Sequence, residues 1–323
     1  MDKEAFKKLT DYLYGKRVFV QTHNFPDPDA IGAGFGFIKL LEHFDIPATL
    51  CYVGQIDRVS TRKMTQLCGI KIYAENELPL EMRPGDPVIC IDSQKGGGNI
   101  KDLPGDEIAC IDHHPTIAGI DYLYKDVRKT GSCATLIGEY FRQLEIEPEE
   151  LTATALLYGL KMDTAHFTRG VTPMDIDIFA YLFEKASEPV LTELSTNNME
   201  FGDLKAYGSA IENIILYDKV GFACIPFSCP DAQIAVVADF ILSLEEVDVA
   251  IIYSKRPNGY KFSVRSETPK VDAGRLIAGA IGDIGSGGGH SFMAGGFLPS
   301  EGVATLGDFP DNALRERFLK QVK

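Results

Sequence analysis

Apolar and polar positions along the first half of the chain follow two alternating periods. Short runs rich in β-branched residues predict strands, and longer stretches with apolar residues three to four positions apart predict helices. The predicted strands are RVFVQT (17–22), ATLCYV (48–53), PVICID (87–92) and EIACID (107–112). The predicted helices lie near 30–44, 131–144, 149–162 and 174–186. This alternation predicts a doubly wound α/β domain with a mostly parallel sheet.

The apolar pattern weakens after Ala186, and a second series of elements follows. This series comprises a helix near 203–215, a strand VGFACIPF, a helix at 231–242 and two alternating runs within 247–266. Pro-Asn-Gly joins the two runs and predicts a β-hairpin, so the second sheet is expected to be mixed. The expected organisation is a first domain over 1–186, a linker over 187–205 and a smaller α/β domain over 206–323.

The composition is that of an ordinary soluble protein. The 323 residues are 45% hydrophobic and 24% charged. No apolar run approaches the roughly 18 residues that a membrane helix needs. The N-terminal residues MDKEAFKKLTDYL lack the apolar core of a signal peptide. We therefore expect a cytoplasmic protein that has no membrane partner.

Cysteine usage and charge restrict the sites and partners further. The seven cysteines form no CxxC pair and mostly lie in apolar runs, which predicts buried, reduced thiols. The net charge of −14 argues against binding of long duplex nucleic acid, because such binding depends on a basic surface. A short anionic substrate is compatible with this charge if cations lie in the site.

Three of the predicted strands end in residue types that bind metals. The first strand is followed by His23, the third ends at Asp92, and the fourth ends at Asp112 with His113 and His114 behind it. In an open parallel sheet, ligands bind outside the carboxyl ends of the strands. We therefore expect these side chains to gather at one edge of the first sheet.

Further carboxylates are expected at the same edge. Asp27 and Asp29 lie in the loop after the first strand, and the predicted helix at 149–162 ends beside Asp163. Two unit charges about 4 Å apart repel by about 4 kcal/mol at an effective dielectric constant of about 20, so these carboxylates need cations. Each motif alone has an ordinary explanation as a turn or a helix cap. Their convergence on one edge favours divalent metals.

The ligand types indicate the metal and the chemistry. Imidazole and carboxylate ligands without thiolates suit Mn²⁺, with Mg²⁺, Co²⁺ and Zn²⁺ as lesser alternatives. Two such ions about 3.5–4 Å apart can share a bridging aspartate and a bridging hydroxide, and they can hold the attacking and leaving oxygens of a phosphoryl group. The pattern therefore predicts phosphoester hydrolysis.

These motifs resemble those of the DHH family of phosphoesterases, whose name describes the triplet that stands here as Asp112, His113 and His114. The resemblance extends over nearly the whole chain. It includes the C-terminal domain of one subfamily, which carries a GGGH motif found here at 287–290. One departure from the family pattern is Pro28, which stands where a glycine commonly lies.

Carried over to this sequence, the resemblance implies two metal ions. The implied ligands of one ion are His23, Asp27 and Asp92, and those of the other are Asp29, Asp92, His113 and Asp163. Asp92 is thereby implied to bridge the two ions. His114 is implied to face the substrate phosphate as a donor or acid toward the leaving group, and Asp112 is implied to orient the histidines.

The resemblance also implies that the second domain binds the nucleotide. Its implied substrate contacts are Arg265, Gly287, Gly288, Gly289 and His290. A guanidinium suits a terminal phosphate or a base face, and glycines let backbone amides approach a ligand closely.

By resemblance to bacterial nanoRNA-degrading members, the implied substrates are very short oligoribonucleotides and 3′-phosphoadenosine 5′-phosphate. Alternatives with the same chemistry are linear or cyclic dinucleotide messengers and, as for an exopolyphosphatase, inorganic polyphosphate. A non-enzymatic alternative is a nucleotide-sensing module. The resemblance also admits a homodimer.

Overall fold

The computed structural model describes residues 1–196 and 198–322, which divide into two compact units. Unit 1 comprises Met1–Asn198 and unit 2 comprises Met199–Lys323. The division falls inside the expected linker at 187–205. That region also contains a helix, α7 (Glu188–Leu194), whose buried leucines belong to the core of unit 1.

Unit 1 contains one parallel sheet. Its strands are β1 (Val18–Thr22), β2 (Ala48–Tyr52), β3 (Ile72–Ala74), β4 (Pro87–Ile91), β5 (Asp106–Asp112) and β6 (Tyr124–Val127). They lie in the order β3-β2-β1-β4-β5-β6, and every neighbouring pair is parallel. The four predicted strands correspond to β1, β2, β4 and β5, which confirms the predicted α/β class with a parallel sheet. The chain order reverses between β1 and β4, and open α/β sheets bind ligands at such a switch point.

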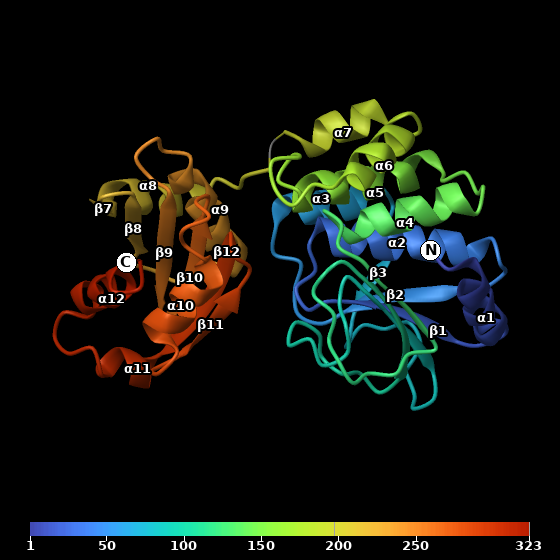
Figure 1. The fold of residues 1–323 in the computed structure, drawn as a ribbon, viewed down its shortest axis with the longest axis horizontal. Coiled ribbons are helices and arrows are strands. Elements are labelled where there is room, and N and C mark those ends of the chain that lie inside the picture. The colour runs from blue at the N-terminus through green and yellow to red at the C-terminus, as the bar shows by residue number, and fades with distance from the viewer. Residues whose placement is uncertain (197, 323) are drawn as a thin grey trace. The chain divides into compact units, whose positions relative to one another are not determined.

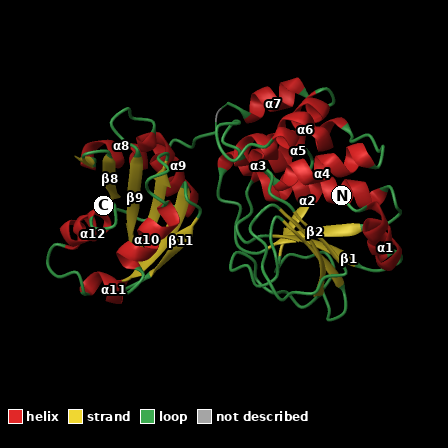
Figure 2. Cartoon of the chain, in the orientation of Figure 1, coloured by secondary structure: helices red, strands yellow, loops and turns green. Residues whose placement is uncertain are grey.

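Helices cover one face of this sheet. They are α1 (Lys3–Leu13), α2 (Pro28–Glu42), α3 (Val59–Leu67), α4 (Cys133–Gln143), α5 (Glu150–Asp163), α6 (Pro173–Phe183) and α7. Of these, α2, α4 and α5 lie over the same face of the sheet (Figure 1), where their apolar side chains form the main core. Irregular segments cover much of the opposite face (Figure 2), where Met82 and Leu103 pack against Phe19. The predicted helices correspond to α2, α4, α5 and α6.

Close packing of α2 against α5 depends on glycine. A Cβ atom at Gly32 would lie 2.6 Å from the carbonyl oxygen of Ala155, and one at Gly36 would lie 2.8 Å from a methyl carbon of Leu156. Gly32 and Gly36 therefore let the two helices approach closely. The packing brings the beginning of α2 beside the end of α5.

Unit 2 contains a mixed sheet with helices on both faces. Its elements are α8 (Asp203–Asn213), β7 (Ile215–Tyr217), β8 (Val220–Ile225), α9 (Asp231–Leu242), β9 (Val249–Arg256), β10 (Gly259–Ser266), α10 (Ala273–Ile281), β11 (Ser286–Gly289), β12 (Met293–Pro299), α11 (Ser300–Ala304) and α12 (Pro310–Leu319). The strand order is β11-β12-β10-β9-β8-β7. Among the described strands of unit 2, β8 and β9 form the only parallel pair, and the other neighbouring pairs are antiparallel. The predicted hairpin is confirmed as β9 and β10, and the predicted mixed sheet is confirmed with it.

The seven cysteines are unpaired, and all except the half-buried Cys224 are buried, as expected for reduced thiols. No helix within residues 1–196 and 198–322 is long and apolar enough to cross a membrane.

Candidate metal centre

The strand ends at the switch point carry chemically active side chains. His23 directly follows β1, Asp92 directly follows β4, and Asp112 ends β5. The backbone of Asp92 is left-handed, with a φ angle of +58°, a conformation that costs a non-glycine residue about 1 kcal/mol or more. Strain of this kind concentrates at functional sites, where the surrounding structure enforces it.

Seven side chains of unit 1 bring potential ligand atoms together in three groups. The groups are His23, Asp27 and Asp92; Asp29, His113 and Asp163; and Asp92, His113 and His114. Within each group the selected nitrogen and oxygen atoms lie within 4.8 Å of one another. The structure therefore gathers at one edge of the sheet all of the side chains that the sequence indicated there.

Asp92 belongs to two of these groups, one with His23 and one with His113, and presents a different oxygen to each. Its Oδ2 lies 3.6 Å from Nε2 of His23, and its Oδ1 lies 3.3 Å from Nε2 of His113. Oδ1 is buried and has no hydrogen-bond partner within the described part of the chain. A buried carboxylate oxygen without a hydrogen bond is costly, so its position favours a cation beside it.

Backbone carbonyls fix the two histidines that face Asp92. Nδ1 of His23 lies 2.9 Å from the carbonyl oxygen of Asn24, and Nδ1 of His113 lies 3.1 Å from that of Thr130. Donation from Nδ1 leaves the lone pair of Nε2 directed at the carboxylates, which is the usual arrangement of a metal-binding imidazole. Both rings are therefore oriented for ligation through Nε2.

Asp27 and Asp29, at the beginning of α2, have different roles. Asp27 is the N-cap of α2, since its Oδ1 accepts hydrogen bonds from the N–H groups of Asp29 and Ala30, and Pro28 occupies the first turn. Proline is favoured there because its fixed φ suits the helix. Pro28 therefore supports the loop without displacing either carboxylate.

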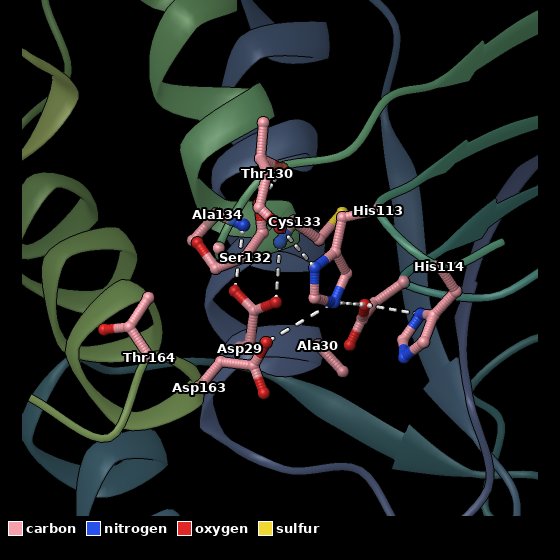
Figure 3. Close-up of polar contacts among 12 residues, drawn as sticks. Asp29, Ala30, His113, His114, Thr130, Ser132, Cys133, Ala134, Asp163 and Thr164 are labelled. Atoms are coloured by element: carbon pink, nitrogen blue, oxygen red, sulfur yellow. Dashed lines mark hydrogen bonds and ion pairs between the residues drawn. The ribbon is translucent and has the colours of Figure 1, made fainter. Parts of the chain in front are cut away.

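Asp29 is buried against the beginning of α4. Its oxygens accept hydrogen bonds from the N–H groups of Cys133 at 2.7 Å and Ala134 at 2.8 Å, as Figure 3 shows. A helix N-terminus carries unpaired N–H groups and partial positive charge, so it stabilises a carboxylate. This contact fixes the position of Asp29 beside His113.

Asp175 of α6 holds the turn that leads into α4. Both of its oxygens accept hydrogen bonds from the N–H group of Gly131, and it also accepts from the hydroxyls of Thr135 and Thr172. The sequence analysis did not identify Asp175, because its partners Gly131 and Thr135 lie about forty residues away and only the tertiary fold brings them to it.

Asp112 anchors the residues that follow it. Its Oδ1 accepts hydrogen bonds from the N–H groups of His113 and His114 and lies 2.8 Å from Nδ1 of His114. Its Oδ2 accepts a hydrogen bond from Gln94 at 2.7 Å, while Oε1 of Gln94 accepts one from Ile117. Ligation of a metal through Nδ1 of His114 would break the bond to Asp112. Gln94 was missed in the sequence, where it is one polar residue of an irregular loop.

The charges of these seven side chains favour bound cations. Burial, followed by the charges of Asp92 and Asp163, raises the pKa of Asp29 well above its usual range. Burial and the charge of Asp27 raise the pKa of Asp163 to about 7. Burial alone would lower the pKa of His23, but Asp27 and Asp92 raise it to about 10. Asp163 extends from the end of α5 toward His113 (Figure 3), with 3.4 Å between its Oδ2 and Nε2.

Arg265 lies near the end of β10, and its guanidinium is buried in hydrogen bonds within unit 2. Its Nε donates to Asp239 at 2.6 Å and its Nη1 donates to Ser263 at 3.0 Å. The sequence analysis expected this guanidinium to bind a nucleotide. Its pairing with Asp239 was not foreseen, because the partner lies on α9 and precedes it by 26 residues.

The expected GGGH motif is a strand followed by a turn. Glycines 287–289 belong to β11, at the edge of the sheet. His290 follows, and its ring stacks on Phe292 with 5.6 Å between ring centroids. The N–H group of His290 donates to the carbonyl of Met293, the residue that pairs with Arg265. The expected substrate residues of unit 2 therefore lie on β10, on β11 and directly after β11, and β12 separates these two strands in the sheet.

Two family models match the sequence. The model for the DHH family, N-terminal domain, matches residues 17–160, and the model for the DHHA1 domain matches residues 216–316. Together the two matches span more than half of the chain. The first includes the candidate metal ligands except Asp163, and the second includes Arg265 and His290.

Curated relatives are similar at low identity. An uncharacterised protein of Methanocaldococcus jannaschii is 26% identical over 95% of this chain and 62% of its own length. The cyclic-di-AMP phosphodiesterase GdpP of Bacillus subtilis is 25% identical over 75% of this chain and 39% of its own length. The probable bifunctional oligoribonuclease and PAP phosphatase NrnA of Streptococcus mutans is 24% identical over 86% of this chain and 88% of its own length. The chain thus spans less than two thirds of the first two relatives.

Solved structures share the fold. An exopolyphosphatase-related protein from Bacteroides fragilis aligns with a TM-score of 0.72 over 99% of this chain and 98% of that chain, at 17% identity. RecJ from Thermus thermophilus, in complex with Mn²⁺, aligns with a TM-score of 0.54 over 98% of this chain and 54% of that chain, at 13% identity. From the matches of both domains, we conclude that the chain belongs to the DHH family and carries a DHHA1 domain behind its DHH N-terminal domain.

Proposed function

We propose that this chain is a metal-dependent hydrolase of phosphoester bonds in short nucleotides. The observation that carries the proposal is the position of Asp92, whose two oxygens face two separate groups of imidazole and carboxylate side chains. A carboxylate shared in this way suits a pair of divalent cations acting on a phosphoryl group. The names of two relatives, a cyclic-di-AMP phosphodiesterase and a probable oligoribonuclease, support the same chemistry.

The side chains fit two divalent ions. We infer that one ion is held by His23, Asp27 and Asp92, and the other by Asp29, Asp92, His113 and Asp163. The oriented Nε2 atoms and the buried oxygen of Asp92 are suitable donors, and nitrogen and oxygen donors without thiolate favour Mn²⁺ over softer metals. When bound, such ions neutralise the phosphoryl oxygens and lower the pKa of a water molecule.

The protein's own residues complete the site. Asp112 holds Nδ1 of His114, so Nε2 is the atom of His114 that can serve a substrate oxygen. Burial lowers the pKa of His114, but the hydrogen bond that its Nδ1 donates to Asp112 and the charge of Asp92 raise it overall, which favours the protonated ring. We infer that His114 donates a proton to the leaving oxygen, as general acids of suitable pKa do.

Short oligoribonucleotides and 3′-phosphoadenosine 5′-phosphate are the proposed substrates, in keeping with the similarity to NrnA. The similarity to GdpP supports linear or cyclic dinucleotides as the alternative. The proposed contacts in unit 2 are Arg265, glycines 287–289 and His290. Because Arg265 is paired with Asp239, a nucleotide phosphate has to compete with that carboxylate for the guanidinium.

A comparison of substrates tests the proposed function. Chelator-stripped protein is titrated with Mn²⁺ while hydrolysis of a labelled diribonucleotide, 3′-phosphoadenosine 5′-phosphate, cyclic di-AMP, a long oligomer and polyphosphate is followed. We expect turnover of the diribonucleotide and the adenosine bisphosphate, with little turnover of the long oligomer. Failure to hydrolyse any of them after the ions have bound would contradict the enzyme proposal. Preferential cleavage of cyclic di-AMP would support the alternative substrate class.

Binding of Mn²⁺ is expected to release protons near neutral pH. The pKa of His23 is raised to about 10 and that of Asp163 to about 7, so these two groups hold protons that metal ligation must displace. Release on the order of one proton per ion is expected. Calorimetric titration in two buffers of different ionisation enthalpy measures it, and equal enthalpies in both buffers would refute the prediction. The variant His23→Gln should release fewer protons.

A further inference from the structure

Phe25 is an exposed aromatic residue in the loop between two candidate metal ligands. It stands two positions after His23 and two before Asp27, and 62% of it is exposed. Its backbone is left-handed, with a φ angle of +55°. A bulky residue adopts this conformation at a cost of about 1 kcal/mol or more. Packing within the protein does not explain why a strained and largely exposed ring lies in the loop between two candidate metal ligands.

Hydrogen bonds on both sides hold this loop in place. The N–H group of Phe25 donates to the carbonyl of Val53 at 2.8 Å, and that of Asn24 donates to the carbonyl of Asn99 at 2.7 Å. The side-chain oxygen of Asn24 also accepts a hydrogen bond from the N–H group of Lys101. The loop is therefore anchored to two neighbouring segments, which fixes the point from which the Phe25 side chain extends.

Gly54 makes room for the ring. A Cβ atom at position 54 would lie 2.8 Å from two carbon atoms of the Phe25 ring, and the backbone of Gly54 has a φ angle of +94°. The close approach of the ring and the positive φ angle both favour glycine at this position. The ring thus rests against the Gly54 backbone while most of its surface stays open to solvent.

A positive charge lies on the same segment as Gly54. Arg58 is the N-cap of α3, and its side chain makes no capping hydrogen bond. The segment from Gly54 to Arg58 therefore supplies a support for the Phe25 ring and a guanidinium. A flat base joined to a phosphate matches these two features.

We propose that Phe25 determines specificity by stacking on the nucleobase attached to the phosphate at the metal centre. The proposal rests on the proposed function and narrows it to phosphoesters that carry a base. Aromatic rings stack on any base, because every base has a π-face. Phe25 should therefore favour nucleotides over base-free phosphates such as polyphosphate without selecting one base.

Binding of two products that differ only by the base tests this proposal. Adenosine 5′-monophosphate and ribose 5-phosphate are titrated calorimetrically into Mn²⁺-loaded protein and into the variant Phe25→Leu. The variant is expected to bind the adenosine nucleotide about five- to a hundredfold more weakly and ribose 5-phosphate as tightly as the wild type. The variant Phe25→Tyr should keep the wild-type affinity for both, because it keeps the ring.

A matched control is Phe183→Leu, which removes a ring that is 55% exposed on α6 and should change neither affinity. Gly54→Ala gives a second readout, because the added methyl group must displace the ring. It should weaken binding of the adenosine nucleotide as Phe25→Leu does. Equal weakening of both ligands by Phe25→Leu, or no weakening of either, would overturn the proposal.

The binding experiment separates this inference from the proposed enzymatic activity. If dinucleotides are hydrolysed and Phe25→Leu binds both ligands as the wild type does, the enzyme proposal stands and the stacking proposal fails. If no phosphoester is hydrolysed but the base-dependent loss of binding is seen, the stacking proposal stands for a nucleotide-binding protein.

Discussion

Replacement of Asp92 by asparagine is expected to lower the rate of phosphoester hydrolysis by about a thousandfold or more. One side chain faces both ligand groups, through Oδ2 toward His23 and through Oδ1 toward His113. Loss of its charge weakens both ion sites at once. Bound ions supply several kcal/mol of charge stabilisation in such reactions, and about 1.4 kcal/mol corresponds to a factor of ten in rate.

Asparagine is the suitable replacement because it tolerates a left-handed backbone better than alanine does, and the φ angle at this position is +58°. The measurements are the hydrolysis rate of a diribonucleotide and the number of Mn²⁺ ions bound per chain. A matched control is Asp106→Asn, which changes an exposed carboxylate at the beginning of β5, the end of the strand opposite Asp112. Retention of two tightly bound ions and a near-normal rate in Asp92→Asn would refute the bridging role.

The position of the candidate site could be predicted because it depends on a rule about strands. The buried runs of β1, β4 and β5 are apolar and unambiguous, and parallel strands present their carboxyl ends at one edge. His23, Asp92 and Asp112 could therefore be placed together from the sequence alone. Asp163 followed from the end of a clearly periodic helix.

Contacts that join unrelated segments could not be predicted. The bonds from Asp29 to the N-terminus of α4 depend on which helix packs beside α2, and periodicity carries no information about that choice. The same applies to Gln94, whose side chain links Asp112 to the loop at Ile117. In unit 2, Asp239 reaches Arg265 only because α9 packs against β9 and β10.

Some elements were missed for local reasons. The strands β3 and β6 are three and four residues long, too short to show a period of two. The strand β11 consists largely of glycine, which is unfavourable in strands, so no strand was predicted there. For α1 the signal was present, since Phe6, Leu9 and Leu13 recur at helical spacing on its buried face.

Replacement of Asp112 by asparagine is expected to lower the rate by about 10- to 100-fold, the usual effect of losing a residue that orients a catalytic or metal-binding imidazole. Oδ1 of the new side chain can still accept the hydrogen bonds of His113 and His114. Its amide nitrogen, however, would face Nε2 of Gln94, so two donors would oppose each other. Gln94 cannot simply rotate, because its Oε1 accepts a hydrogen bond from Ile117.

The pH dependence of kcat distinguishes loss of the Asp112 charge from mere displacement of the His114 ring. The hydrogen bond and charge of Asp112 help to raise the pKa of His114, and a general acid must be protonated to act. Without that charge the pKa of His114 falls, so the alkaline decline of kcat should move to lower pH. A second substitution, Gln94→Glu, restores an acceptor opposite Asn at position 112 but leaves the new charge farther from His114. The double variant should therefore recover part of the rate, while the alkaline decline of its kcat stays at the lower pH. If the alkaline decline of kcat does not move in Asp112→Asn, His114 is not the acid.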